Sequence, residues 1–384
     1  MSKSRQMSRR TFLRTSAVLG VGLVAAGCVV PTPPATTDEA SEVSEPSEAD
    51  IQGININYLG WEGYDWADAL KPLTEPNDIT VNSTYGGNNE EIFAKLKAGS
   101  EGQYDIVSIY HGTIAAMVEN DLLQPIDTSR VEHWDDLLES FKSQPWQVID
   151  GEIYSVPFTW GNTPVAYNPE FVPDGIQSWN DLKKPEYKDK IVLVDNSIQE
   201  LDVALIATGA DITQPVTKDE LAQAAEWYMD IKDNARAIVP NYGEMADMLA
   251  REEAWLTGGV WVAVVGWAAD KGVTLETLIP EEGTFGWCDN YVIPKGADLD
   301  AAYAFINQMT SPEGQAELAA YLGQEMTNKK VIPLLPEEMQ KAYATAEEDL
   351  KKTPFPPDPP LTSDDPNIAT YSDIIDTWEE IKAN

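Results

Sequence analysis

From residue 54 onward, short β-rich segments alternate with segments of helical periodicity, and this alternation favours an α/β architecture. Residues 54–59 read Ile-Asn-Ile-Asn-Tyr-Leu and predict a strand, because apolar and polar residues alternate along them. Residues 79–85 and 104–108 predict two further strands, and residues 89–98 between them predict a helix with one apolar side. Strands that alternate with helices in this way are typical of parallel sheets.

A second run of alternation begins with the apolar segment 191–195. The other elements predicted after it are a helix from Leu201, a helix over 218–233, a central strand over 255–265, helices over 299–308 and 312–322, and a last helix over 374–383 after a proline-rich bend at 353–360. Segments 158–168 and 286–294 are expected to cross between the two halves.

The predicted fold is therefore α/β and two-lobed, each lobe a central mixed β-sheet flanked by helices, with two crossover segments between the lobes. The expected boundaries are residues 53–157 with 291–333 for lobe 1, and residues 158–290 with 334–384 for lobe 2. In such a fold a small molecule binds in the crevice at the carboxyl ends of the strands.

The first 27 residues have the proportions of an export signal. They carry five cations and no acid, and the apolar run 17–27 is about half as long as a membrane crossing requires. Residues 8–14, Ser-Arg-Arg-Thr-Phe-Leu-Arg, resemble a twin-arginine signal. The run ends Val-Ala-Ala-Gly-Cys, which resembles a bacterial lipobox, so Cys28 is the expected site of lipidation. The alternative is a cleaved secretory signal followed by an incidental cysteine.

Residues 28–52 are rich in Pro, Thr, Ser and Glu and have little apolar surface to bury. They predict a disordered tether between the lipidated cysteine and the folded part. The expected location is the outer face of the cytoplasmic membrane, with the lipid as the contact to the membrane.

The charge balance restricts the classes of partner. The chain has 26 Lys and Arg against 64 Asp and Glu, a net charge of −38. This excess argues against nucleic acid, whose phosphates need clustered cations, and it attracts cationic solutes. The acids can equally form a solubilising surface. His111 and His133 lie far apart in sequence, and lipidation of Cys28 would leave Cys288 without a disulfide partner, so no metal site, cofactor or disulfide is expected.

Aromatic residues recur where predicted strands end, at positions from which side chains reach a ligand in open α/β sheets. They include Trp61, Tyr110, Trp261 and Trp287, and Asp289 lies two residues after the last of these. A ring face holds a cation with about 0.5–2 kcal/mol, and a carboxylate adds about 1.5–3 kcal/mol. These residues predict a site for a small organic cation, although packing in a core explains any single tryptophan equally well.

Six segments are informative in combination: residues 57–64, 84–96, 104–110, 156–161, 178–188 and 286–294. Together they resemble the spermidine/putrescine-binding proteins of bacterial ABC importers. The stretch Ser-Trp-Asn-Asp-Leu-Lys-Lys-Pro-Glu-Tyr-Lys over 178–188 is a marker of that family's fold rather than of its ligand. The resemblance implies a two-lobed, non-enzymatic binding protein that functions with an ABC permease, and a monomer is expected.

The resemblance also implies which side chains contact the ligand. They are Trp61, Tyr64, Tyr110, Trp261, Trp287 and Asp289, with Glu62 in the first loop and Ser108 at the end of the third strand. Where spermidine binders have an Asp and a Glu after strand 191–195, this chain has the amides Asn196 and Gln199, and a tyrosine expected near the second crossing is Gln324.

Two negative charges are thus missing from the expected site, unless Asp195 or Glu200 supplies one. The ligand class therefore stays open: besides a polyamine such as spermidine, it includes a shorter diamine, a monocation, a quaternary amine and a zwitterionic amino compound. Two other classes of protein remain as alternatives: a secreted hydrolase with paired carboxylates, and an adhesin without a small ligand.

Overall fold

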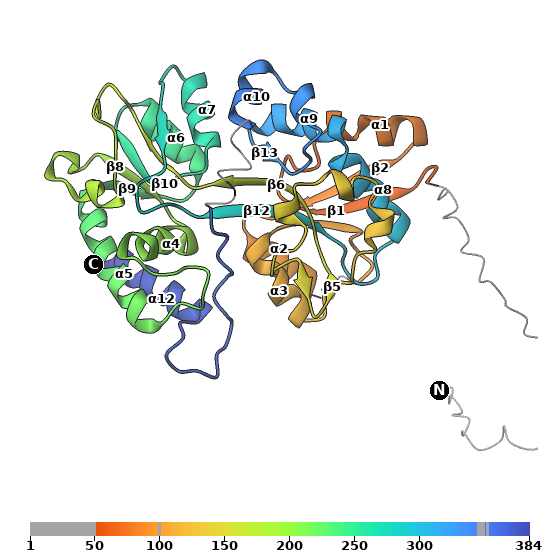
Figure 1. Ribbon diagram of the computed structural model, residues 1–384, viewed down its shortest axis with the longest axis horizontal. Coiled ribbons are helices and arrows are strands. Elements are labelled where there is room, and N and C mark those ends of the chain that lie inside the picture. The colour runs from red at the N-terminus through yellow and green to blue at the C-terminus, as the bar shows by residue number, and fades with distance from the viewer. Residues whose placement is uncertain (1–50, 99–100, 344–349, 351–352) are drawn as a thin grey trace, which may run out of the picture. The chain divides into compact units, whose positions relative to one another are not determined.

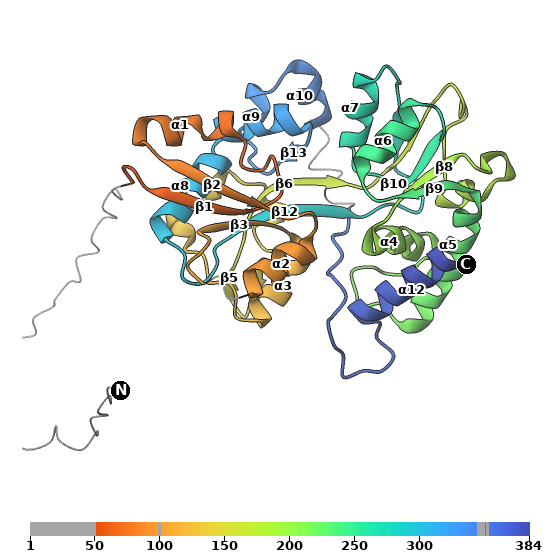
Figure 2. The same cartoon turned by 180° about the vertical axis from the view of Figure 1, so that it is seen from behind.

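The structure is a computed structural model that describes residues 51–98, 101–343, 350 and 353–384. Within these residues two β-sheets form the centres of two lobes, which Figures 1 and 2 show from opposite sides. The predicted signal peptide at 1–27, Cys28 and most of the predicted tether at 28–52 lie outside the described residues. In the part of the chain that is described, no helix has the length and apolarity needed to cross a membrane.

Lobe 1 is built on a mixed sheet that has six strands among the described residues. In order across the sheet they are β13 (Glu325–Met326), β6 (Val156–Asn162), β12 (Gly286–Val292), β3 (Ile106–Tyr110), β1 (Asn55–Gly60) and β2 (Thr80–Tyr85). Strand β1 runs parallel to β2 and β3, whereas β12 is antiparallel to both β3 and β6.

Helices cover both faces of this sheet. One face packs against α1 (Ala67–Asn77), α8 (Leu299–Thr310), α9 (Pro312–Leu322) and α10 (Glu337–Tyr343), and the other against α2 (Asn89–Lys97) and α3 (His111–Glu119). Ile56 and Tyr58 of β1 lie in the first core and Leu59 in the second, as the period of two along a strand requires. Phe158 and Trp160 of β6 also enter opposite cores, because a bulge interrupts the pairing of β6 with β12.

Lobe 2 contains a sheet that has five strands among the described residues. They are, in order, β11 (Glu276–Leu278), β7 (Val165–Tyr167), β10 (Leu256–Gly259), β8 (Ile191–Val194) and β9 (Ala235–Val239). One face packs against α4 (Ser197–Thr208), α5 (Lys218–Asn234) and α12 (Tyr371–Ala383), and the other against α6 (Tyr242–Ala250) and α7 (Ala263–Asp270).

Smaller elements complete the described chain. They are the hairpin of β4 (Val148–Ile149) and β5 (Glu152–Ile153), and short 3-10 helices at Thr128–Arg130, Trp134–Asp136, Glu139–Phe141, Trp179–Lys183, Pro185–Tyr187 and Ile332–Leu334.

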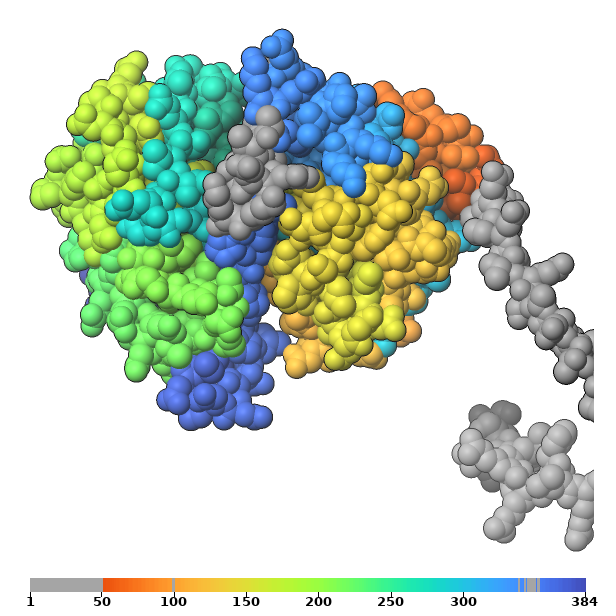
Figure 3. Space-filling view, in the orientation of Figure 1, coloured from red at the N-terminus to blue at the C-terminus, as the bar shows by residue number. Residues whose placement is uncertain are grey.

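A third segment runs between the lobes in addition to the two predicted crossovers. Residues 353–370, here called the C-terminal strap, lead from lobe 1 to α12 on lobe 2 (Figures 1 and 3). At one end the N–H of Gly286 donates to the carbonyl of Pro354 at 2.7 Å, and at the other the N–H of Ala369 donates to that of Val216 at 2.8 Å. The expectation of two crossovers was therefore incomplete.

The predicted lobe boundaries also need correction. The boundaries after 157 and after 290 fall inside β6 and β12, and both of these strands belong to the lobe 1 sheet. Helix α10, which the sequence placed in lobe 2, contributes Tyr343 to a lobe 1 core. Local periodicity marks a strand but does not show which sheet it joins.

Other differences have local causes. The strand predicted over 255–265 ends at Gly259 and α7 begins at Ala263, because an apolar run fits a buried helix as well as a strand. The helix predicted from Leu201 begins at Ser197, since the side chain of Asn196 caps it by accepting from the N–H of Gln199 at 3.1 Å. Strand β9 and helix α6 were not predicted.

Candidate functional site

A cavity of about 1270 Å³ is lined by residues of both lobes and of the C-terminal strap. Five of the aromatic side chains that line it form what we call the aromatic slot: Trp61, Tyr64, Tyr110, Trp261 and Trp287. Trp61 and Tyr64 follow β1, Tyr110 ends β3, Trp261 follows β10 and Trp287 lies on β12. The strand ends of both sheets thus bring together rings that are as much as 226 positions apart in the sequence (Trp61 and Trp287).

Small residues and hydrogen bonds hold these rings in place. The indole of Trp287 lies over Gly161 of β6, where a Cβ would be 2.6 Å from Cζ2 of the indole. The edge of Trp261 meets Tyr242, with ring centroids 5.8 Å apart and planes at 64°. Behind the slot, Ser108 is fully buried and its Oγ accepts from the N–H of Trp61 at 3.3 Å. Ser108 therefore supports the first loop and does not line the cavity.

Asp289 places a carboxylate among the rings. It is directly opposite Tyr110 in the pairing of β12 with β3, and it is 7% exposed. Its Oδ2 accepts from the hydroxyl of Tyr64 at 2.5 Å. Burial raises the pKa of Asp289 to about 7, and the bond from Tyr64 lowers it only in part. Burial disfavours the ionised form of Asp289, and a cation that enters the slot would stabilise this form by neutralising its charge.

The lining of the cavity is strongly acidic. Its carboxylates among the described residues are Glu90, Glu119, Asp150, Asp195, Asp202, Asp289, Asp358 and Glu379. Lys382 is the single cation among the described lining residues, and it already pairs with Asp195 at 3.0 Å and with Glu379 at 2.8 Å. The field in the cavity therefore favours cationic ligands.

The structure brings eight of the eleven predicted binding residues to this one cavity: Trp61, Tyr64, Tyr110, Asn196, Gln199, Trp261, Trp287 and Asp289. Three predicted residues do not line it. Glu62 is exposed, Ser108 lies behind the first loop, and Gln324 is buried beside β6, where Thr159 donates to its Oε1 at 3.1 Å.

The two amides after β8 are already engaged by the protein. Asn196 caps α4, and Gln199 donates to the carbonyl of Gly259 at 3.0 Å while accepting from Tyr242 at 2.5 Å. The two acids that the sequence offered in their place, Asp195 and Glu200, are also bound within the protein. Asp195 is bound by Lys382 and by Trp378, and Glu200 is fully buried and accepts from Tyr228 at 2.6 Å.

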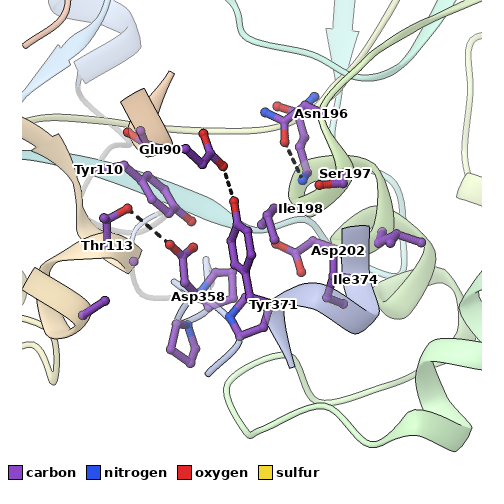
Figure 4. A pocket seen from close by; sticks show the side chains of 18 of the residues that line it. Glu90, Tyr110, Thr113, Asn196, Ser197, Ile198, Asp202, Asp358, Tyr371 and Ile374 are labelled. Atoms are coloured by element: carbon purple, nitrogen blue, oxygen red, sulfur yellow. Dashed lines mark hydrogen bonds between the residues drawn. The ribbon is translucent and has the colours of Figure 1, made fainter. Parts of the chain in front are cut away.

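Among the polar side chains of the cavity that were not predicted from the sequence are Glu90 of α2, Asp202 of α4, Asp358 of the C-terminal strap and Tyr371 of α12 (Figure 4). Tyr371 donates to Glu90 and so connects α12 of lobe 2 with α2 of lobe 1. A signal was present in the sequence, since Asp202 interrupts an apolar helical segment and Asp358 stands between two pairs of prolines.

Several known proteins resemble this chain in sequence. A spermidine/putrescine-binding periplasmic protein of Salmonella typhimurium is 30% identical over 290 residues, which cover 74% of this chain and 80% of the relative. The putrescine-binding periplasmic protein PotF of Escherichia coli is 24% identical over 307 residues, covering 72% of this chain and 80% of the relative.

Among solved structures, the spermidine/putrescine ABC transporter substrate-binding protein PotD from Streptococcus pneumoniae, in complex with calcium and HEPES, superposes with a TM-score of 0.73. It is 27% identical, and the match covers 86% of this chain and 98% of that one. The two-lobed α/β prediction is confirmed by this likeness. The family model described as bacterial extracellular solute-binding protein matches residues 68–347. Such proteins bind solutes and are not enzymes, which sets aside the hydrolase alternative. The chain belongs to the family of bacterial extracellular solute-binding proteins.

Proposed function

We propose that this protein captures a polyamine or a related small organic cation and delivers it to an ABC permease. The observation that carries the proposal is the position of Asp289, a buried carboxylate inside a slot of aromatic rings. Aromatic faces attract ammonium groups and pack against alkyl chains, and the carboxylate supplies the counter-charge.

The slot has enough groups for useful affinity. Two or three cation–π contacts at about 0.5–2 kcal/mol each and one charged hydrogen bond at about 1.5–3 kcal/mol approach the roughly 8 kcal/mol of a micromolar complex. The alkyl chain would contribute about 0.8 kcal/mol for each buried methylene. The names of the Salmonella and Escherichia coli relatives, which bind spermidine or putrescine, support the same class of ligand.

Isothermal titration calorimetry with spermidine, putrescine and glycine betaine tests this proposal. Saturable binding of the polyamines at micromolar concentration is expected, and preference for betaine would instead assign a quaternary or zwitterionic ligand. Trp261→Ala should weaken binding by more than about tenfold, because it removes one ring from the slot. Trp255→Ala is the matched control, since Trp255 stacks on Phe171 and does not line the cavity. If none of these amines binds, the proposed ligand class is wrong.

We further infer that the protein is exported through its twin-arginine signal and held at the membrane by lipid on Cys28, with residues 29–52 as a tether. The sequence motifs at 8–14 and 24–28 support this, as does the periplasmic location named for the relatives. Mass spectrometry of the mature protein should find an N-terminal diacylated Cys28. If the N-terminus of the mature protein is unmodified, the inferred lipid anchor is wrong, whereas the inferred export still stands.

A further inference from the structure

The side chain of Asp202 lies in the cavity without a partner. It is 9% exposed, and no hydrogen bond from a described residue reaches its buried Oδ2. Figure 4 shows its carboxylate directed into the cavity, on the side of Tyr371 and Asp358. We propose that Asp202 and Asp358 form a second anionic subsite, which binds the far ammonium of a diammonium ligand whose first ammonium is held at Asp289. This proposal rests on the proposed function.

The C-terminal strap holds Asp358 firmly in this position. Its Oδ2 accepts from the hydroxyl of Thr113 at 3.2 Å, and the carbonyl of Pro356 is 2.9 Å from Nε2 of the buried His111. A Cβ on Gly112 would lie 2.4 Å from Oδ1 of Asp358. The glycine therefore permits a close approach of the carboxylate to α3 that any other residue would prevent.

The charges around this pair are negative. Glu90 is a nearby carboxylate, and Lys382, the single cation among the described lining residues, is already bound to Asp195. Burial, followed by the charge of Asp358, raises the pKa of Asp202, and burial, with Glu90 contributing, raises that of Asp358 to about 7. Two carboxylates that lack a protein cation are costly to ionise, and an ammonium between them would remove this cost.

Tyr110 connects the two anionic positions. Beyond burial, the charges of Asp358, Asp202 and Asp289 all raise the pKa of its hydroxyl, so this one ring is within electrostatic reach of both subsites. Tyr110 is also the cross-strand neighbour of Asp289. An alkyl chain that runs along Tyr110 would place one ammonium at each end.

The position of Asp202 also explains how the cavity can have amides, and not acids, directly after β8. Asp202 follows Gln199 by three positions on α4 and therefore lies on the same side of the helix, one turn farther along. The negative charge that Asn196 and Gln199 do not supply is thus present at a neighbouring place. A metal ion is a poorer occupant, because the described residues contain no group of three or more His, Cys, Asp or Glu side chains disposed to hold one.

The experiment compares putrescine with butylamine, a monoamine with the same number of carbons, by calorimetry at pH 8. Wild-type protein should bind putrescine at least about tenfold more tightly than butylamine, since only putrescine can make the second charge-assisted contact. Asp202→Asn and Asp358→Asn should each weaken putrescine binding about tenfold and change butylamine binding less than about twofold. Asp376→Asn on the exposed side of α12 is the control and should change neither.

Gly112→Ala gives a further test, because a Cβ there would meet Oδ1 of Asp358 at 2.4 Å and Cε1 of Tyr110 at 2.6 Å, and so displaces both the carboxylate and the neighbouring ring. It should weaken putrescine binding at least as much as Asp358→Asn does and, through Tyr110, also weaken butylamine binding, with melting temperatures reporting that each variant is folded. Unchanged putrescine affinity in Asp202→Asn, or equal losses for both amines in that variant, would overturn the subsite and leave the proposed function standing. Saturable calcium binding that Asp202→Asn abolishes would assign the pair to a metal instead. Absence of binding by any amine to the wild type would defeat both proposals.

Discussion

At the scale of single residues, the site depends on carboxylates held in apolar surroundings. Asp289 has one oxygen bound by Tyr64 and is otherwise enclosed by the aromatic slot. Burial raises its pKa to about 7, so near neutral pH it is divided between the neutral and charged forms. An ammonium ligand binds the charged form, and ligand binding is therefore linked to release of a proton.

This linkage predicts that amine affinity rises with pH. An alkyl ammonium, whose pKa is about 10, stays charged between pH 5 and 8, whereas Asp289 loses its proton across this range. Butylamine affinity should increase up to about tenfold per pH unit below pH 7 and level off above it. Calorimetry at pH 5, 6, 7 and 8 measures this, and Asp289→Asn should bind weakly with little dependence on pH. A wild-type affinity that does not change between pH 5 and 8 would contradict the role of Asp289.

At the scale of elements, pairs of strands position the rings. The pairing of β6 with β12 sets Gly161 opposite Trp287, and the absence of a side chain at 161 leaves space for the indole. In lobe 2, Gly259 has the same role in packing, because a Cβ there would meet Thr163 at 2.8 Å and Val203 at 3.0 Å. The strands thus determine the shape of the slot as much as the rings do.

Gly161→Ala should push the Trp287 indole out of its place. Overpacking of this kind costs about 1–3 kcal/mol, and we expect putrescine affinity to fall by about five- to hundredfold. Tryptophan fluorescence should report the altered environment of the ring.

Gly266→Ala is the matched control, since a Cβ at this position of α7 meets no atom within 4 Å. The control should bind normally and be more stable by up to about 1 kcal/mol, because alanine favours helix. Unchanged binding by Gly161→Ala would mean that the indole does not contact the ligand.

At the scale of the whole molecule, buried acids link stability to pH. Burial raises the pKa of Glu200, Asp289 and Asp358 to about 7 each, above their values in an unfolded chain. Between about pH 4 and 7 the native state therefore binds more protons than the unfolded state, and the free energy of unfolding falls as pH rises. Asp358, which is partly exposed, contributes less than the other two.

The ligand-free protein should accordingly melt at a lower temperature at pH 7.5 than at pH 5, by about 5–10 °C. Differential scanning calorimetry in 0.5 M NaCl measures this while screening repulsion among surface acids. Asp289→Asn should reduce the difference, and saturating putrescine should also reduce it, because the ligand stabilises the ionised form. A melting temperature that rises between these two pH values would refute the assignment.

Much of the fold could be predicted from local patterns. The strand at 54–59 and the helix at 218–233 follow from periodicity and match β1 and α5 closely. Asp298 and Ser311 cap α8 and α9 as expected.

The run 255–265 was misread because buried strands and buried helices share the same composition. Trp61 and Tyr110 could be predicted as lining residues since they follow strands, whereas Glu62, next to Trp61, turns out to be exposed.

The sequence by itself determined the alternation of strands and helices, the acidic character of the molecule and the aromatic residues at strand ends, because each depends on residue type and local spacing. Only the tertiary structure decided that β6 and β12 belong to lobe 1 and that the C-terminal strap brings Asp358 to the cavity that Asp202 also lines. These two residues are 156 positions apart, and contacts over such a separation depend on packing among elements, which local periodicity does not encode.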